Sequence, residues 1–314
     1  MHSSLSRKLR LYWEFVRPFT LVAPSVGMLS GGLTAIGATT EGAGRWVSAW
    51  GDGPAAMALR IGAGALMAAL LNGFSNTLNQ IYDVEIDRIN KPQRPLCEER
   101  ITLREAWLVT VTLLVVSLLL ALVVGRQCFL LAAAAAVFTW SYSAEPLRTK
   151  KRGMLANLTV AIPRGVLLKV CGWSTVKTIL TPEPWIIGAV FGVFLLGATT
   201  TKDYADMKGD AVGGCRTLPL IYGVRRSAWM ISPFFVIPFV GLVIAALQGW
   251  FTGDKTVLVG LGALLALWGA WVVQGILRDP DALAGSENHP SWRHMYLMMF
   301  ALQAGFALAY WVRV

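Results

Sequence analysis

Long apolar stretches recur from one end of the chain to the other, separated by short polar and charged connections. A helix needs about 20 predominantly apolar residues to cross the hydrocarbon core of a bilayer. Several stretches contain Gly, Pro or polar residues, which membrane helices tolerate when neighbouring helices satisfy the freed backbone groups. The pattern predicts an all-α, polytopic membrane protein with nine transmembrane helices in one bundle. The predicted spans are 17–38, 55–82, 105–124, 127–144, 153–173, 184–204, 228–248, 256–277 and 294–312.

The composition supports a protein built for lipid. Hydrophobic residues make up 55% of the chain, charged residues only 15%, and the mean hydropathy is +0.55. These proportions do not suit soluble domains. Since no polar stretch is long enough to form a separate soluble unit, residues 1–314 are predicted to form a single transmembrane domain.

Lysine and arginine are distributed unevenly between the two ends of the predicted helices. Twenty fall on the side of the N-terminus and five on the other side, namely Arg45, Arg126, Lys177, Lys255 and Arg313. Because cytoplasmic connections carry an excess of Lys and Arg, the N-terminus is predicted to be cytoplasmic. After nine crossings the C-terminus lies on the opposite side. The net charge of +10 is thus a topology signal, and neither a nucleic-acid partner nor an obligatory protein partner is expected.

The cysteine positions argue against two kinds of cross-link. The four cysteines, Cys97, Cys128, Cys171 and Cys215, have no CxxC spacing. They fall on predicted helices or on the cytoplasmic side, so neither a disulfide framework nor a zinc site is expected.

Two groups of acidic residues stand at the ends of the second and the sixth predicted helices. Each extends a polar stripe that steps by four, three and four residues, so that its members share one helix face. The stripes are Asn72, Asn76, Asn79 and Asp83 in the first case and Thr199, Asp203, Asp206 and Asp210 in the second. Polar side chains at membrane depth are costly unless they face the protein interior or water. The two stripes are therefore predicted to face each other across a cavity at the cytoplasmic boundary.

The chemistry of these stripes suits a hard cation. Carboxylate and amide oxygens are the ligands that magnesium prefers, and magnesium characteristically bridges carboxylates to substrate phosphates. The basic residues Lys91, Arg94, Arg148, Lys150 and Lys202 flank the stripes. A metal and diphosphate site is therefore predicted. The structural alternative, in which each acid pairs with a neighbouring base, is less favoured for two similarly spaced groups at corresponding helix ends.

The same residues carry a family resemblance. The first group is similar to the Asn-Asp-x-x-Asp-x-x-x-Asp signature of the UbiA-type intramembrane prenyltransferases, written here as Asn79-Gln80-Ile81-Tyr82-Asp83-Val84-Glu85-Ile86-Asp87. The second resembles their Asp-x-x-x-Asp motif, here Asp206 to Asp210. A further segment resembles their Tyr-Ser-x-x-Pro-Leu-Arg sequence, here Tyr142-Ser143-Ala144-Glu145-Pro146-Leu147-Arg148. The resemblance covers nearly the whole chain.

One position departs from the signature. Gln80 replaces its second residue and removes a negative charge, a variant that resembles the homogentisate prenyltransferases. The departure puts in doubt whether this position touches a metal.

The resemblance implies an enzyme that uses magnesium to transfer a prenyl group from an allylic prenyl diphosphate to a lipophilic acceptor, with release of diphosphate. The acceptor would be a quinone or aromatic precursor, a chlorophyllide-like molecule or a glycerol lipid. The implied metal ligands, for two Mg2+ ions, are Asn79, Asp83, Asp87, Asp203, Asp206 and Asp210. The expected catalytic residues are Asp83, Asp206, Arg148, Lys202 and Tyr142. The expected substrate-binding residues are Asn79, Lys91, Arg94, Lys150, Arg164 and Asn76.

Polar residues inside the fifth predicted helix also need a role. Arg164 follows Pro163 about 17 Å along the helix, too deep for easy access to the cytoplasmic face, so it is predicted to line the cavity. There it would contact the diphosphate or an anionic acceptor, or, alternatively, pair with a backbone carbonyl freed by Pro163 or with another helix. Lys169 is expected to reach outward to the opposite interface.

Three tyrosines near the acidic groups, Tyr82, Tyr142 and Tyr204, are candidates to face an allylic cation. Tyrosines at a membrane interface also act as simple anchors. Tyr142 is preferred among the three.

Two other functions are weighed against prenyl transfer. A phosphatidyl-transferring membrane enzyme also uses aspartates and a divalent metal, but its acidic residues are expected in one contiguous motif. A carboxylate-lined cation transporter would place its ionisable residues near the bilayer midplane. Here the acids form two groups at the helix ends beside basic residues, which favours prenyl transfer.

Overall fold

The computed structural model describes residues 2–40, 53–285 and 289–312, so that Arg45 and Arg313 lie outside the described residues. Every regular element within these ranges is a helix, which confirms the all-α prediction. The elements are α1 (His2–Val16), η1 (Pro18–Leu21), α2 (Val22–Gly37), α3 (Pro54–Tyr82), α4 (Val84–Asn90), α5 (Leu103–Val124), α6 (Arg126–Ser143), η2 (Thr149–Lys151), α7 (Met154–Ala161), η3 (Ile162–Leu167), α8 (Leu168–Ser174), α9 (Glu183–Ala198), η4 (Thr199–Lys202), α10 (Asp203–Val212), α11 (Leu218–Tyr222), α12 (Val224–Ile231), η5 (Ser232–Phe235), α13 (Ile237–Leu247), α14 (Lys255–Arg278), α15 (Ala282–Gly285) and α16 (Pro290–Trp311).

Within the described part of the chain, seven helical stretches are long and apolar enough to cross a membrane. They are Pro18–Gly37, Pro54–Tyr82, Leu103–Val124, Met154–Ser174, Glu183–Val212, Val224–Leu247 and Lys255–Arg278. The other two predicted spans form α6 and α16, of 18 and 22 residues, which carry more polar side chains, such as Gln127 and His294. The chain is therefore an integral, multi-pass membrane protein, and nine crossings stay a prediction.

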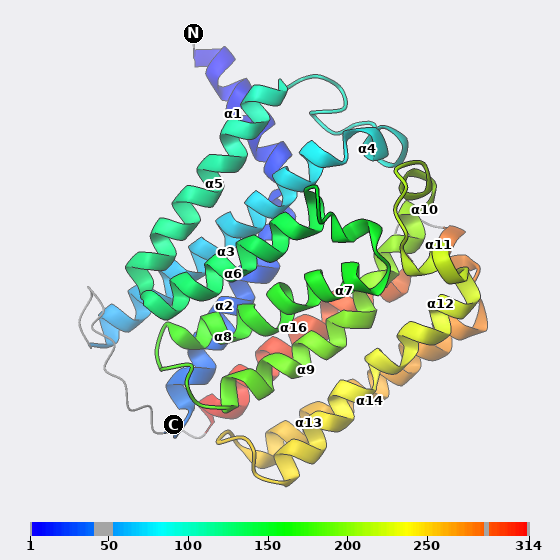
Figure 1. Ribbon diagram of the computed structural model, residues 1–314. Coiled ribbons are helices and arrows are strands. Elements are labelled where there is room, and N and C mark those ends of the chain that lie inside the picture. The colour runs from blue at the N-terminus through cyan, green and yellow to red at the C-terminus, as the bar shows by residue number, and fades with distance from the viewer. Residues whose placement is uncertain (1, 41–52, 286–288, 313–314) are drawn as a thin grey trace.

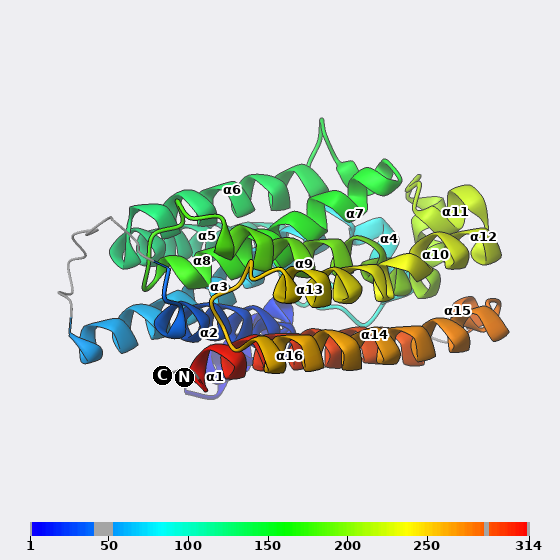
Figure 2. The same cartoon turned by 90° about the horizontal axis from the view of Figure 1, so that it is seen from below.

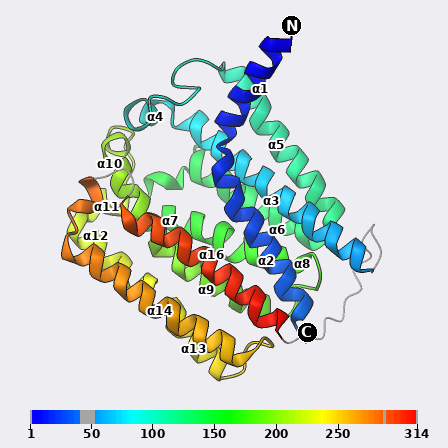
Figure 3. The ribbon, with the colours of Figure 1, turned by 180° about the vertical axis from the view of Figure 1, so that it is seen from behind.

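The long helices run side by side in one bundle (Figure 1). Helix α2 packs against α3, α8 and α16, and α3 packs in turn against α5. Figure 3 shows α2 and α16 next to each other although they come from opposite ends of the chain. Seen from below, α14 and α16 lie along one side of the bundle and α6 and α7 along the other (Figure 2). Helix α1 begins at one end of the bundle, and α16 finishes at the other.

Short helices extend the bundle at the end where α3 and α9 finish. Helix α4 follows α3 with a change of direction at Asp83, and its first turn carries Glu85 and Asp87, which suit the positive end of a helix dipole. Helix α10 continues from α9 through the single turn η4. Because α4 packs against α10, the two acidic motifs meet at this end (Figure 1).

The fifth predicted span is not one regular helix. It consists of α7, the π-helical segment η3 and α8. Pro163 lies in η3, where its missing N–H disturbs the regular hydrogen bonding. The backbone of Gly165 lies directly against α9, since a Cβ on Gly165 would be 2.6 Å from Gly192 Cα. This irregular segment carries Arg164 into the cavity described below.

The prediction that Lys169 reaches outward was wrong. Its side chain is only 1% exposed. Its Nζ donates to Ser30 Oγ at 2.7 Å and lies 3.4 Å from Gln303 Oε1, and two phenylalanine rings lie 5.4 Å from the same nitrogen. Oxygen acceptors on α2 and α16 thus replace the interfacial water that the outward position would have offered. The sequence could not show that α2 and α16 supply acceptors to a lysine of α8.

Candidate active site

Both polar stripes line one cavity of about 380 Å³. Its polar end holds the first stripe, from α3, and the second stripe, from η4 and α10, so the prediction that they face a common cavity is confirmed. Helix α3 lines the cavity from Met67 to Asp83, a distance of about 24 Å at the helical rise. The other end is walled by apolar side chains, including Met28, Leu131 and Leu167. The cavity therefore joins a charged end to an apolar interior.

Asp83 is the most enclosed acid of the first motif, with 1% of its surface exposed. Its Oδ2 accepts hydrogen bonds from Asn79 Nδ2 at 2.7 Å and from Lys150 Nζ at 2.6 Å. Its Oδ1 accepts from Arg148 Nη2 at 3.2 Å. Lys150 Nζ also lies 3.3 Å from Asp210 Oδ1, so that one lysine links the two motifs. Burial by itself lowers the pKa of Lys150, but the carboxylates of Asp83 and Asp210 raise it well above its usual range, which keeps the lysine charged.

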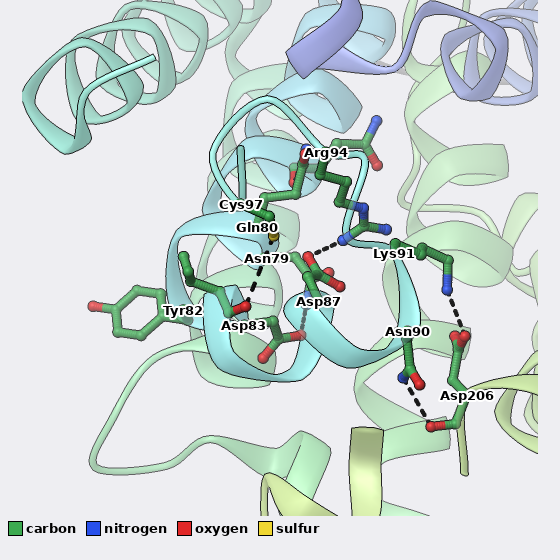
Figure 4. A network of polar contacts seen from close by, with 12 residues as sticks. Asn79, Gln80, Tyr82, Asp83, Asp87, Asn90, Lys91, Arg94, Cys97 and Asp206 are labelled. Carbon is green, nitrogen blue, oxygen red and sulfur yellow. Dashed lines mark hydrogen bonds and ion pairs between the residues drawn. The ribbon is translucent and has the colours of Figure 1, made fainter. Parts of the chain in front are cut away.

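Asp87 lies one turn farther along, in α4, and is 5% exposed. Arg94 Nη1 donates to Asp87 Oδ2 (Figure 4). Burial raises the pKa of Asp87, and the positive charge of Arg94 offsets this only in part. A buried carboxylate of this kind gains from further positive charge nearby, which makes the position suitable for a cation.

The acids of the second motif face the same space from α10. Lys91 reaches across from the loop after α4 and donates to Asp206 Oδ1 at 2.5 Å (Figure 4), and Lys202 Nζ lies 3.6 Å from the same oxygen. Among the described residues, the Asp203 side chain has no hydrogen-bond or ion-pair partner. Asp210 Oδ1 is buried without a hydrogen bond in that part of the chain, because its ion pair lies outside hydrogen-bonding geometry. Within the described part of the chain, Asp203 thus has no partner to give up, whereas Asp210 Oδ1 lacks a hydrogen bond but is ion-paired with Lys150.

Asn90 ties the two motifs together. Its Nδ2 donates to the carbonyl oxygen of Asp206 at 2.9 Å, and its Oδ1 accepts from Gly209 N at 2.9 Å. A Cβ on Gly209 would lie 2.5 Å from Asn90 Nδ2, so this close approach requires glycine. Sequence reasoning missed Asn90. Its position, three residues beyond Asp87, continues the spacing of the first stripe, and that signal could have found it.

Two arginines add positive charge without acidic partners. Arg164 lines the cavity as predicted, and so does Arg17, which sequence reasoning counted only as a topology residue. Among the described residues, neither guanidinium has a hydrogen-bond or ion-pair partner. Burial, together with the positive charges of Arg94 and Arg164, lowers the pKa of Arg17. Like charges that converge in a half-enclosed site favour the binding of an anion.

Of the three candidate tyrosines, only Tyr142 lines the cavity. Tyr82 points away from the acidic residues (Figure 4) and packs edge-on against two tryptophans. Tyr204 is buried, and its hydroxyl lies 3.0 Å from Ser227 Oγ. Tyr142 is thus the one tyrosine of the three that can face a substrate.

Three further positions support the site through hydrogen bonds or ion pairs to neighbouring segments. Arg148 does not line the cavity, and it forms an ion pair with Asp83 on the side away from the cavity. Asn76 lines the cavity, but its Nδ2 donates to Val16 O at 3.0 Å and so anchors the segment that carries Arg17. Gln80, the departure from the family signature, does not line the cavity, and its Nε2 donates to the Phe15 carbonyl at 2.8 Å. This position therefore ties α1 to α3.

The oxygen donors of the polar end are of the type that a hard cation prefers. Their side chains are not, however, arranged around a common point. Among the described residues, no three His, Cys, Asp or Glu side chains are grouped closely enough to hold a metal ion. Lysine and arginine side chains pair with several of the carboxylates instead. The ligands are nevertheless all oxygen donors, and Asp203 and Asp210 have oxygens without hydrogen bonds. In its chemistry, this set of oxygen donors suits Mg2+.

The fold and this cavity define a helical membrane protein with a cavity that is charged at one end and apolar at the other. The model of the UbiA prenyltransferase family matches residues 39–287. The chain belongs to this family, which confirms the resemblance seen in the two acidic motifs.

Individual relatives agree with this assignment. The chain is 30% identical to the bacteriochlorophyll synthase 34 kDa chain of Chloroflexus aurantiacus over 69% of this chain and 66% of that one. It is 28% identical to the homogentisate phytyltransferase of Synechocystis sp. over 84% of this chain and 77% of that one. The match thus spans slightly less than two thirds of the Chloroflexus protein. A UbiA homologue from Archaeoglobus fulgidus, solved with GPP and Mg2+, superimposes on this chain with a TM-score of 0.71. The superposition covers 96% of this chain and 99% of that one. At 19% sequence identity, this similarity supports the fold.

Proposed function

We propose that this chain transfers a prenyl group from an allylic prenyl diphosphate to a lipophilic acceptor inside the cavity and releases diphosphate. One observation carries the proposal: the carboxylates of both motifs meet lysines and arginines at one end of a cavity whose other end is apolar. A prenyl diphosphate has the same two parts, a charged head and an apolar chain. The named activities of the relatives from Chloroflexus and Synechocystis support this reading.

We assign the binding of two Mg2+ ions to the oxygen donors of the polar end, Asn79, Asp83, Asp87, Asp203, Asp206 and Asp210. When bound, Mg2+ supplies positive charge that stabilises the departing diphosphate. The Archaeoglobus homologue, solved with GPP and Mg2+, supports this assignment. Because the Asp203 side chain has no hydrogen-bond or ion-pair partner among the described residues, it requires the least rearrangement to become a ligand.

The basic residues of the polar end bind the diphosphate. Lys91, Arg94 and Lys150 now neutralise the acids of the two motifs, and Lys202 lies beside Asp206. A diphosphate offers these side chains alternative anionic partners and frees carboxylate oxygens at the same time. Preorganised positive charge of this kind stabilises the charge that develops on a leaving group. Arg148 contributes by fixing Asp83 from outside the cavity.

The remaining cavity residues act on the reacting carbon and on the acceptor. Tyr142 presents its ring to the allylic centre, where it stabilises positive charge. Apolar walls keep water from that centre, so that the acceptor rather than water captures the prenyl group. Arg164 binds an acidic group of one of the two substrates. The acceptor is a quinone or aromatic precursor, a chlorophyllide-like molecule or a glycerol lipid.

The proposed setting is one transmembrane domain of residues 1–314 with nine crossings. The N-terminus is cytoplasmic, the C-terminus lies on the opposite side, and the polar end of the cavity opens toward the cytoplasm. The unequal distribution of Lys and Arg supports this orientation, and so do the opposite ends at which α1 begins and α16 finishes. The reaction requires membrane lipid and its two substrates, with no obligatory protein partner.

The test is release of diphosphate by the purified protein in detergent with Mg2+ and prenyl diphosphates of different lengths. The reaction is run with and without a lipid extract, and the lipids are then analysed by mass. Magnesium-dependent release with a prenyl-sized mass gain on one lipid is expected, and it identifies the acceptor. No release with any donor would contradict the proposal and favour phosphatidyl transfer or cation transport.

A further inference from the structure

Two cysteines that are far apart in the sequence meet inside the bundle. Cys128 of α6 and Cys171 of α8 are buried, at 0% and 4% exposure, and their Sγ atoms lie 3.4 Å apart. A disulfide requires a separation of about 2.0 Å, so the two sulfurs need to approach by about 1.4 Å. Both thiols are free, and neither Cys97 nor Cys215 has a cysteine partner.

The pair lies at the apolar end of the cavity. Cys171 lines the cavity wall, while Cys128 lies behind it. Both belong to a cluster of apolar side chains that includes Met28, Met67 and Leu131, which line the same end. Because α3 lines the cavity for about 24 Å between Met67 and the acidic motif, the sulfurs are remote from the charged end. Cys171 is thus the sulfur that faces the cavity, among apolar side chains that favour a lipophilic reagent over a water-soluble one.

We propose that Cys128 and Cys171 form a redox-active thiol pair, which a membrane-soluble disulfide converts to a disulfide bridge between α6 and α8, and that this bridge slows prenyl transfer. In the first step Cys171 attacks the reagent, forms a mixed disulfide and releases one thiol. In the second step Cys128 attacks the mixed disulfide, and the second thiol leaves. The two cysteines together lose two electrons and two protons, and the reagent is reduced to two thiols.

Closure of the bridge changes the cavity because both helices line it. Leu131 and Ala132 of α6 and Leu168 of α8 lie in its wall. Closing the gap of about 1.4 Å between the sulfurs shifts side chains and backbone of α6 and α8 where they wall the space that receives the prenyl chain. Displacements of about 1 Å can cost large factors in rate, and we expect about a tenfold fall in turnover with long donors, with a smaller fall for short donors. This rate effect rests on the proposed function, whereas formation of the bridge does not.

The test treats the full-length protein in detergent with 4,4′-dithiodipyridine, a lipophilic aromatic disulfide, and identifies cysteine-containing peptides by mass. The expected result is a Cys128–Cys171 bridged peptide, lighter by two hydrogens than its reduced parts. Oxidised glutathione, which is water-soluble, should produce no bridge. The variant with Cys128→Ala should instead retain the mixed disulfide at Cys171. The matched control carries Cys128→Ala and Cys171→Ala, keeps Cys97 and Cys215, and should form no bridge.

The result that overturns the proposal is a folded protein in which Cys171 is modified but no bridged peptide appears. A bridge that leaves turnover with long donors equal to that of the treated matched control overturns the effect on transfer. Recovery of turnover after reduction with dithiothreitol supports that effect. The mass readout does not depend on activity, so a protein that proves inactive toward every prenyl diphosphate still decides whether the bridge forms.

Discussion

Buried carboxylates occur at both ends of the bundle, in two very different surroundings. At the far end from the acidic motifs, Glu183 is 3% exposed and accepts hydrogen bonds from Thr252 N at 2.6 Å and from the Tyr310 hydroxyl at 2.5 Å. The side chains of Thr40 and Thr252 also donate to it. None of these residues lines the cavity. Their hydrogen bonds join α9 and α16 to the loop before α14.

At the cavity end, Asp83 is buried to a similar degree, but its partners include Lys150 and Arg148 and it opens into a cavity. Neutral hydroxyl and backbone amide donors stay bound to a carboxylate, because no competing anion attracts them more strongly. Lysine and arginine side chains can exchange a carboxylate for a phosphate. The comparison teaches that two acids of similar burial can differ in the nature of their partners, and the proposed function assigns the functional role to the acid with basic partners.

Removal of magnesium should have the largest effect on activity. A chelator is expected to reduce diphosphate release to background, because the departing diphosphate then lacks the charge that stabilises it. Diphosphate release is measured before and after EDTA and again after Mg2+ is added back. Full activity in EDTA would contradict the proposal that the carboxylates of the acidic motifs, unlike Glu183 at the far end, bind a catalytic metal. Thermal unfolding without substrate serves as the control that the fold survives.

Loss of a single carboxylate charge should come next. Asp83→Asn and Asp206→Asn are each expected to lower turnover by about 10² to 10³-fold, the range found when one electrostatic contact to a transition state is removed. Glu85→Gln is the matched control, because Glu85 belongs to the same motif but its side chain is 79% exposed and pairs with Arg88. Near-normal turnover in both aspartate variants would refute the site.

Arg164→Leu is expected to raise the Michaelis constant of one substrate about tenfold, equivalent to ~1.4 kcal/mol of binding energy. The constants for donor and acceptor are measured separately, and the one that rises identifies the partner of the guanidinium. Arg164→Lys, which keeps the charge, should recover part of the loss. Two unchanged constants would assign Arg164 a purely structural role in η3.

Glu183→Gln should leave turnover at low temperature nearly unchanged and destabilise the fold by about 1 to 3 kcal/mol, because an amide nitrogen then faces donors that need an acceptor. Thermal unfolding in detergent measures the loss. Tyr310→Phe should show the same pattern with a smaller shift. A large drop in turnover with unchanged stability would mean that Glu183 takes part in catalysis, and the contrast with Asp83 would then be wrong.

Periodicity carried most of what could be predicted from the sequence. The apolar stretch at 127–144 became α6 at Arg126–Ser143. The members of each stripe line the cavity together because helical spacing determines which side chains share a face. The segment η3 was missed, since the hydrophobic pattern continues through it and only Pro163 marks the break.

Contacts between distant segments could not be predicted from the hydrophobic periodicity of the sequence. The partners of Lys169 come from α2 and α16, and Cys128 meets Cys171 across 43 residues. No local spacing encodes such pairs, because they depend on which helices become neighbours in three dimensions. Arg17 was missed for the same reason, as its side chain meets the cavity only through the packing of η1 against α3.

The sequence separations within the acidic site imply an order of assembly during synthesis. Asp87 finds Arg94 seven residues later in its own loop, as soon as that loop has emerged from the ribosome. Asp83 can pair with Lys150 only after 67 more residues have been synthesised, and Lys91 can pair with Asp206 only after 115 more. The growing chain therefore neutralises its acids in stages. A nascent protein that stalls before α10 lacks the second acidic motif, and the cavity wall is complete only when α16 has been made.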